Sequence, residues 1–327
     1  MSASTFRVGR AIPTTSDTRT PQRTVAHHYP SLTTTVPKEF VHRASIAEVM
    51  LTDWERLDEH RFTVAAQWPR GHSFFANVDG CHDPLIAAET IRQTGILLAH
   101  AEFGVPLDHH LAVADLGVKV VPQHLRVAST PASLELDVTC SKVKRRRNTL
   151  TGCHIDVSIR REGRLAATGG GSFTCIDPKV YRRLRAAKLL AGEGPRAMPM
   201  TAPEPPQSVG RISPMDVVLS PAGEPDRWQL RVNTHHPVLF DHPVDHVPGM
   251  VLLEAARQAT ALTLGHASLP LDITSEFKRY VEMDTPCTIE ARRIPAPCTD
   301  HSAVLVTAQQ EGAPAFRATV TMASPTG

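Results

Sequence analysis

Two stretches of the chain are apolar on nearly every face of a helix. They cover residues 84–99 and 250–264, and each carries few charged side chains. A helix that is apolar all round is buried on most sides by other elements. Apolar and polar residues alternate over 134–140, 153–159 and 304–308, which is the period of half-buried strands. The pattern therefore predicts two buried helices and several strands.

The two halves of the chain repeat one another. HDPLIAAETIRQTG (82–95) and VPGMVLLEAARQAT (247–260) align without a gap, and each half has a later Glu-Gly turn, at 162–163 and 311–312. This predicts an α+β fold of two units, each with one buried helix wrapped by an antiparallel sheet. The alignment pairs three polar residues of each helix: Glu89 with Glu254, Arg92 with Arg257, and Gln93 with Gln258.

Two polar segments suggest the domain boundaries. Residues 1–36 are polar without a clear period and are interpreted as a disordered arm. Residues 191–210 hold five Pro and three Gly, which disfavour helices and central strands, so they read as a linker. The predicted domains are therefore 37–190 and 211–325.

Composition excludes several classes of function. The net charge is only +2, so a polycation that binds nucleic acid is not expected. The six Cys form no paired metal-binding spacing, and thiols of this kind favour the cytoplasm. No apolar run has the length of a membrane span, and the histidines lack a zinc-binding spacing. We expect no metal. The basic run 144–147 is interpreted as a solvated hairpin tip, with docking of an acidic carrier protein as the alternative.

Each predicted helix carries Glu, Arg and Gln at positions i, i+3 and i+4, which places them on one face. Burying a Glu–Arg pair costs free energy of desolvation, so a buried pair indicates a structural or functional role. A structural ion pair is one interpretation of either copy. The recurrence of the set in both halves favours a site that needs these groups, although duplication would also copy a structural pair.

The approach to the second helix adds candidate chemistry. His242, Asp245 and His246 precede a Pro-Gly pair, and the free amides of a helix start can receive an anion or a developing oxyanion. We expect a thioester carbonyl at the amides of Gly249 and Met250, and Pro248 in the first helical turn.

The first helix starts differently. Asp83 and Pro84 are predicted to be its N-cap and first residue, and a capping carboxylate would occupy the donors that an oxyanion needs. We therefore expect the second half to hold the more complete acyl site.

Four motifs together resemble one family. They are VHR (41–43), HDPLIAAETIRQ (82–93), DPKVYRRLR (177–185) and DHVPGMVLLEAARQA (245–259). The last also resembles hotdog-fold acyl-thioester enzymes in general, although its histidines are spaced differently from those of the dehydratases. The four resemble the A-factor biosynthesis family, the γ-butyrolactone autoregulator synthases of Streptomyces and relatives, over about residues 38–325.

The resemblance implies two tandem hotdog domains paired as a pseudo-dimer within the chain, and no cofactor. It implies an acyltransferase that moves a β-ketoacyl group from acyl carrier protein (or CoA) to dihydroxyacetone phosphate. The product would be the precursor of a signalling lactone. A dehydratase or thioesterase on the same fold is the alternative, and a non-catalytic acyl binder is a third hypothesis.

A mechanism can be written as a hypothesis. Glu254 or His246 accepts the proton of the attacking hydroxyl, and Arg257 or Arg92 holds the phosphate, a task suited to a bidentate donor. Glu89 acts as a second acid or base, or orients the arginines. Replacement of Glu254 or Arg257 is expected to abolish transfer while leaving the fold intact.

Overall fold

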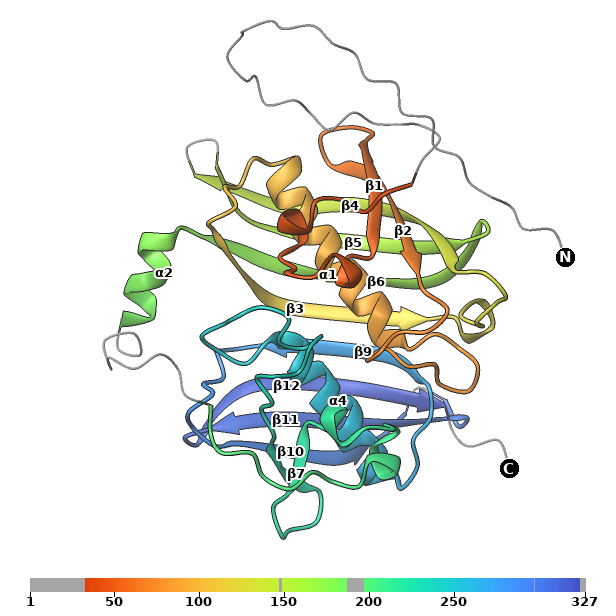
Figure 1. Cartoon of the computed structure of the whole chain (residues 1–327), viewed down its shortest axis with the longest axis vertical. Coiled ribbons are helices and arrows are strands. Elements are labelled where there is room, and N and C mark those ends of the chain that lie inside the picture. The colour runs from red at the N-terminus through yellow and green to blue at the C-terminus, as the bar shows by residue number, and fades with distance from the viewer. Residues whose placement is uncertain (1–32, 147–148, 187–196, 297, 324–327) are drawn as a thin grey trace, which may run out of the picture. The chain divides into compact units, whose positions relative to one another are not determined.

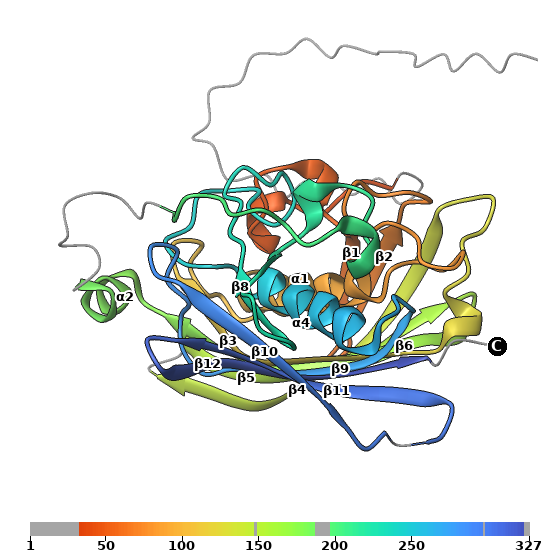
Figure 2. The same cartoon turned by 90° about the horizontal axis from the view of Figure 1, so that it is seen from below.

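One antiparallel sheet carries both halves of the chain. A computed structural model describes residues 33–146, 149–186, 197–296 and 298–323. Within these ranges twelve strands form a sheet in the order β1-β2-β4-β5-β6-β3-β9-β12-β11-β10-β8-β7. Two long helices, α1 (Pro84–Ala101) and α4 (Gly249–Leu264), lie on the same face of this sheet (Figures 1 and 2). This is the predicted α+β double unit, with one buried helix per half.

The sheet divides at its middle. The first half contributes β1 (Leu51–Arg56), β2 (Arg61–Trp68), β3 (His110–Val120), β4 (Ala132–Arg146), β5 (Thr149–Arg161) and β6 (Arg164–Ile176). The second contributes β7 (Leu219–Pro221), β8 (Arg227–Leu230), β9 (Pro270–Phe277), β10 (Cys287–Ile294), β11 (His301–Gln310) and β12 (Ala313–Ala323). The strands that directly follow the two long helices, β3 and β9, pair antiparallel and join the halves. The halves thus associate as two related units around one seam.

The described residues also form several short helices. They are η1 (Lys38–Val41), η2 (Ile46–Glu48), η3 (Pro122–His124), α2 (Pro178–Leu184), η4 (Pro206–Val209) and η5 (Pro214–Asp216). The pair η1 and η2 precedes β1, just as η4 and η5 precede β7, so the repeat between the halves also includes these turns.

The two long helices start as differently as their sequences indicate. The carboxylate of Asp83 accepts a hydrogen bond from the amide of Leu85 at 2.9 Å, and Pro84 is the first residue of α1, as predicted. Pro248 was expected in the first turn of α4 but is its N-cap. Its ψ of 144° is extended, and its carbonyl accepts from the amide of Val251 at 3.0 Å.

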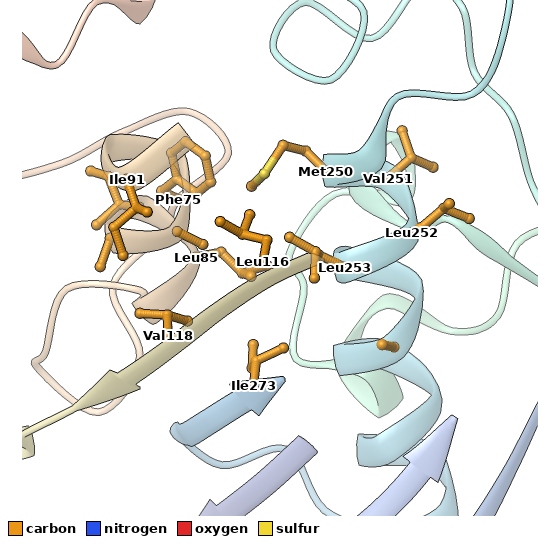
Figure 3. Packing of buried hydrophobic residues seen from close by; sticks show 14 of the residues in the cluster. Phe75, Leu85, Ile91, Leu116, Val118, Met250, Val251, Leu252, Leu253 and Ile273 are labelled. Carbon is orange, nitrogen blue, oxygen red and sulfur yellow. The ribbon is translucent and has the colours of Figure 1, made fainter. Parts of the chain in front are cut away.

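The main core lies between the helices and the sheet. Apolar side chains of both halves meet there, and Met250 extends from the start of α4 toward Phe75 and α1 (Figure 3). Leu116 of β3 and Ile273 of β9 lie in the same cluster at the seam. Because 16 of the 18 residues of α1 are buried, the even apolar character of this helix follows from its surroundings.

Most of the predicted elements agree with the structure. The alternating segments lie within β4, β5 and β11, and both Glu-Gly turns close hairpins. The motif at 177–185 forms the short basic helix α2. Lys144–Arg146 reach the end of β4 at the hairpin with β5, whereas Arg147 lies outside the described residues.

The structure describes the last residues of the predicted arm, 33–36, and residues 197–210 of the predicted linker. Val36 is buried, and its amide donates to the carbonyl of Leu51 at 3.0 Å. At the end of the proposed linker, Val209 of η4 is fully buried. Residues 1–32 and 187–196 lie outside the described residues. The borders of these two segments stay a prediction.

Candidate active site

Glu89 of α1 is the centre of a buried ionic cluster. Arg92 donates to both of its oxygens, from Nε and Nη2, at 2.8 Å each. Gln93 Nε2 donates at 2.7 Å, and Arg43 Nη2 lies 2.6 Å from Oε1. Glu89 is fully buried, whereas the Arg92 side chain is 19% exposed. The carboxylate therefore fixes Arg92 while the outer part of that guanidinium stays accessible.

Glu254 of α4 has the same surroundings. Arg257 donates to both of its oxygens at 2.9 and 2.6 Å, and Gln258 Nε2 is also bonded to it. Arg211 completes the set with bonds of 2.8 and 2.7 Å. Here Arg257 is only 2% exposed, so this copy is closed.

Two arginines that the sequence analysis did not single out as site residues join the halves. Arg43 donates to the carbonyl of Val238 at 3.0 Å, and Arg211 is bonded to the carbonyl of Phe74 at 2.5 Å. Each arginine thus pairs with the Glu of its own half and crosses to the other half. A signal for them exists: VHRASIAEVM (41–50) and VGRISPMDVV (209–218) share Val, Arg, Ser and an acid at matching positions.

The electrostatics of the two carboxylates do not suit a base. Burial alone would raise the pKa of Glu254, but Arg211 and Arg257 outweigh it and lower this pKa to about 2. Arg43 and Arg92 do the same for Glu89, whose pKa is also about 2. A carboxylate whose oxygens already accept bonds from two arginines is a poor proton acceptor at neutral pH. This disfavours the expectation that Glu254 is the base.

A cavity of about 560 Å³ lies between the halves, beside α1 and the start of α4. Its polar lining includes Arg92, His242 and His246, and Gly249 and Met250 at the start of α4 also line it. Glu89, Glu254 and Arg257 are not among its lining residues. The apolar lining comes from both halves and includes Ile91, Gly95, Ile155, Phe173, Leu239, Leu252 and Phe277.

The cavity unites groups that the sequence analysis placed on separate helices. The start of α4, where a thioester carbonyl was expected, lines the cavity, and no described side chain caps this helix. The charged residues of the lining include Arg92 and Arg43 of the first half, whereas Arg257, which follows Gly249 on the same helix, is not among them. This lining disfavours the expectation that the start and the charged face of one helix build the site. Antiparallel pairing of the halves places the start of α4 beside the charged set of α1.

His246 is held by a carboxylate at the edge of the cavity. Its Nδ1 lies 2.7 Å from Oδ1 of Asp245, which also accepts from the hydroxyl of Tyr181 at 2.6 Å. Arg185 donates to Asp245 Oδ2 at 3.0 Å and binds Glu282 as well. Burial opposes the ionised form of Asp245, but His246, Tyr181 and Arg185 together lower its pKa. Asp245 thus touches the cavity through His246, and the basic helix α2 supports it.

His242 has a similar partner. Its Nδ1 lies 2.5 Å from Oδ1 of Asp241, and Asp241 Oδ2 accepts from the amides of Ala44 and Ser45 at 2.8 and 3.3 Å. Arg43 lies 3.5 Å from Asp241 Oδ1. His242 was predicted to be a site residue, whereas Asp241, which orients it, was not.

Within the described residues, the start of α1 in the first half is closed. Asp83 caps α1, and Arg211 Nη1 lies 3.5 Å from its Oδ2. Both side chains are nearly fully buried. The α1 start therefore lacks the free amides that α4 presents, in agreement with the expected inequivalence of the halves.

Neither a metal site nor a membrane span emerges from the described ranges. No three His, Cys, Asp or Glu side chains gather there in a way that could hold a metal ion. Among the helices of the same ranges, none has both the length and the apolar character to cross a membrane.

A family model and several curated relatives identify the same protein family for this chain. The family model described as "AfsA: A-factor biosynthesis hotdog domain" matches residues 25–177 and 195–324. Three curated relatives share the name 2-oxo-3-(phosphooxy)propyl 3-oxoalkanoate synthase. The one from Streptomyces virginiae is 50% identical over 87% of this chain and 96% of its own. Those from Streptomyces coelicolor and Streptomyces griseus are 42% and 41% identical, over 87% and 85% of this chain and 90% and 92% of their own.

Solved structures are more distant. An acyl-ACP thioesterase from Bacteroides thetaiotaomicron matches with a TM-score of 0.49 and 10% identity, over 79% of this chain and 96% of that one. Similarity at this level carries no argument about activity.

Proposed function

This chain belongs to the A-factor biosynthesis hotdog family, and on that premise we propose that it is an acyltransferase. It moves a β-ketoacyl group from a thioester to the hydroxyl of dihydroxyacetone phosphate, the reaction that fits the name of its curated relatives. The product would be the precursor of a γ-butyrolactone-type signal. The observation that supports this most is the cavity, which combines an uncapped helix start, an accessible arginine and an apolar lining.

Each part of the cavity suits one part of the substrates. The amides of Gly249 and Met250 receive the thioester carbonyl, because a helix start stabilises the oxyanion that develops there. The apolar lining, with Ile155 and Phe173, holds the acyl tail. Arg92 binds the phosphate with the edge of its guanidinium that Glu89 leaves free. Glu89 then acts as a positioning residue.

His246 is the proton carrier in this proposal. Its Nδ1 faces Asp245, so Nε2 is the atom that exchanges a proton with the reacting thioester. The ionised Asp245 orients the ring and stabilises the imidazolium form, as an aspartate does for a catalytic histidine elsewhere. His242, which also lines the cavity, binds substrate. Glu254 and Arg257 hold the fold together.

The donor in this proposal is a β-ketoacyl group on acyl carrier protein, with acyl-CoA as the alternative. Basic residues at the cavity edge, Lys278 and Arg279, are exposed and suit an acidic carrier. We propose a cytoplasmic setting, in keeping with free cysteines, five of which are buried.

The direct experiment mixes the protein with a β-ketoacyl thioester, with and without dihydroxyacetone phosphate. Mass spectrometry should detect the ester phosphate and free thiol when both substrates are present. Release of free acid without the acceptor would instead identify a thioesterase, and an enoyl product would identify a dehydratase. Either of these would reject the acyltransferase assignment.

Asp245→Asn should lower kcat by about 10²–10⁴-fold, the usual contribution of a positioned acid–base group. The amide cannot stabilise a charged His246 as the carboxylate does. Glu282→Gln is the matched control, because it removes the other carboxylate partner of Arg185 without touching His246. Steady-state kinetics at equal folded concentration makes the comparison. Equal kcat values for the two variants would remove His246 from the proposal.

A further inference from the structure

His42 adopts a backbone conformation that favours glycine. It ends η1 with φ 51° and ψ 54°, in the left-handed region. Its counterpart in the repeat, Gly210, ends η4 with φ 69° and ψ 31°. The amides of both residues donate to carbonyls of the preceding short helix, so the two residues end their helices in the same way. The second half uses the residue that this conformation prefers, whereas the first half carries a histidine at a cost in backbone strain.

The space around the two positions explains the difference. A Cβ at Gly210 would lie 2.8 Å from Ala267 Cβ and 3.3 Å from Arg257 Nη1, so the closed copy has no room for a side chain. His42 instead lines the cavity, together with Arg92, the counterpart of Arg257. His42, the residue with the strained backbone, therefore lies in the half whose arginine, Arg92, lines the cavity.

The donors and acceptors around His42 and His100 determine which nitrogen of His42 carries a hydrogen. His100 Nδ1 lies 2.8 Å from the carbonyl of Val105, which can only accept, so this nitrogen is the donor. Nε2 of a neutral His100 is then an acceptor, and it lies 2.8 Å from Nε2 of His42. His42 must donate from Nε2, which leaves its Nδ1 unprotonated.

Both rings are neutral at physiological pH. Burial lowers the pKa of His42 to about 3, assisted by His100 and Arg92, and burial also lowers the pKa of His100. Within the described residues, no group bonds to Nδ1 of His42, and this nitrogen is not one of the buried atoms that lack a partner. It is therefore an accessible hydrogen-bond acceptor at the cavity.

We propose that His42 is a catalytic residue whose Nδ1 takes the proton of the acceptor hydroxyl. The inference rests on the proposed acyl transfer and assigns its base. Dihydroxyacetone phosphate has one hydroxyl donor, and Arg92 beside His42 binds its phosphate. An acceptor-only nitrogen at this place suits that hydroxyl. Of the other four cavity imidazoles, those of His109, His242 and His246 each have one nitrogen engaged by an aspartate, and that of His110 is stacked on Tyr181.

The proton balance is complete. As the hydroxyl oxygen bonds to the thioester carbon, its proton moves to His42 Nδ1. The carbon–sulfur bond then breaks, and the imidazolium of His246 gives a proton to the departing sulfur. His42 has gained one proton and His246 has lost one, and exchange with water in the cavity restores both.

Binding of the acceptor would also strengthen the base. The positive charge of Arg92 is one cause of the low pKa of His42. A phosphate dianion on Arg92 offsets that charge and so raises the pKa of His42 in part, while burial and His100 still lower it. Nδ1 is therefore a better proton acceptor with the phosphate bound than without it.

The test replaces the ring and keeps the backbone. His42→Gly should lower kcat by about 10²-fold or more. It should leave the melting temperature equal or higher, because glycine fits the left-handed conformation. Added imidazole should restore part of the rate by occupying the vacated space. His42→Asn, which also tolerates this conformation, should be inactive as well.

Glu311→Gly is the matched control. Glu311 is also left-handed, with φ 52°, but lies in the β11–β12 turn and does not line the cavity. Its replacement should leave kcat unchanged. A His42→Gly kcat within threefold of the wild type would overturn the role of His42 while leaving the acyl transfer intact. So would a loss of rate that imidazole does not relieve. A wild-type protein that forms no ester phosphate would overturn both proposals.

Discussion

Arg92→Ala should lower kcat/KM for dihydroxyacetone phosphate by about 10²–10³-fold, because a buried charge-assisted contact is worth about 2–5 kcal/mol. The loss should fall on the acceptor, while KM for the thioester changes little. Stability should change little as well. Glu89 keeps Arg43 and Gln93 as partners, and the Arg92 side chain is partly exposed.

Arg92→Lys is the conservative comparison. Lysine keeps the charge but cannot bind Glu89 and a phosphate through one planar group, so we expect partial activity with a raised acceptor KM. Initial rates at varied acceptor concentration and saturating thioester give kcat and the acceptor KM. An unchanged acceptor KM in Arg92→Ala would show that the phosphate is bound elsewhere.

Glu254→Gln should destabilise the protein by about 3–5 kcal/mol, the usual cost of removing one partner from a buried ion pair. Arg211 and Arg257 would be left without their carboxylate in a site that is nearly inaccessible to water. The expectation that the fold stays intact on this replacement is therefore revised. Per folded molecule, kcat should stay within about threefold of the wild type, because Glu254 does not line the cavity.

Urea unfolding measures the loss of unfolding free energy. Steady-state kinetics at equal concentrations of folded protein measures kcat. Glu89→Gln is the matched control: it should cost similar stability and also lower the rate, because Arg92 loses its support. A Glu254→Gln protein that is stable but inactive would restore Glu254 to the chemistry.

The same pair predicts a pH dependence of stability. Since the pKa of Glu254 in the folded protein is about 2, below its usual value of 4.5, the pair stabilises the fold above about pH 4.5. This contribution is lost as the pH falls toward 2. The difference in unfolding free energy between the wild type and Glu254→Gln should therefore shrink over that range. A constant difference from pH 6 to pH 3 would contradict the ionised pair.

The helices and strands could be predicted because buried apolar residues recur along the chain with the period of the element that contains them. Residues 84–99 and 250–264 are apolar on all faces since sheet and loops surround α1 and α4. The repeat was also visible, through Glu89 and Glu254 at matching places. The same argument predicted that Asp83 would cap α1 and that the start of α4 would be open.

The composition of the site could not be predicted in the same way. Spacing shows that Glu254 and Arg257 share a helix face, but not which helix start that face meets. That depends on the pairing of β3 with β9. Arg43 and His42 lie in turns without periodicity, so their contacts over long sequence distances left no local pattern. Comparison of 41–50 with 209–218 would have revealed Arg43 and its counterpart, together with the exchange of His42 for Gly210.

The central claim is that one cavity, beside α1 and the start of α4, performs the transfer. The pseudo-equivalent variants Arg92→Ala and Arg257→Ala test it most directly, because each removes one arginine from a Glu that keeps another arginine and a glutamine. The measurement is kcat/KM for dihydroxyacetone phosphate per folded molecule. We predict a loss of about 10²–10³-fold for Arg92→Ala and a value within about threefold of the wild type for Arg257→Ala. Loss of transfer in Arg257→Ala with full activity in Arg92→Ala would contradict the account.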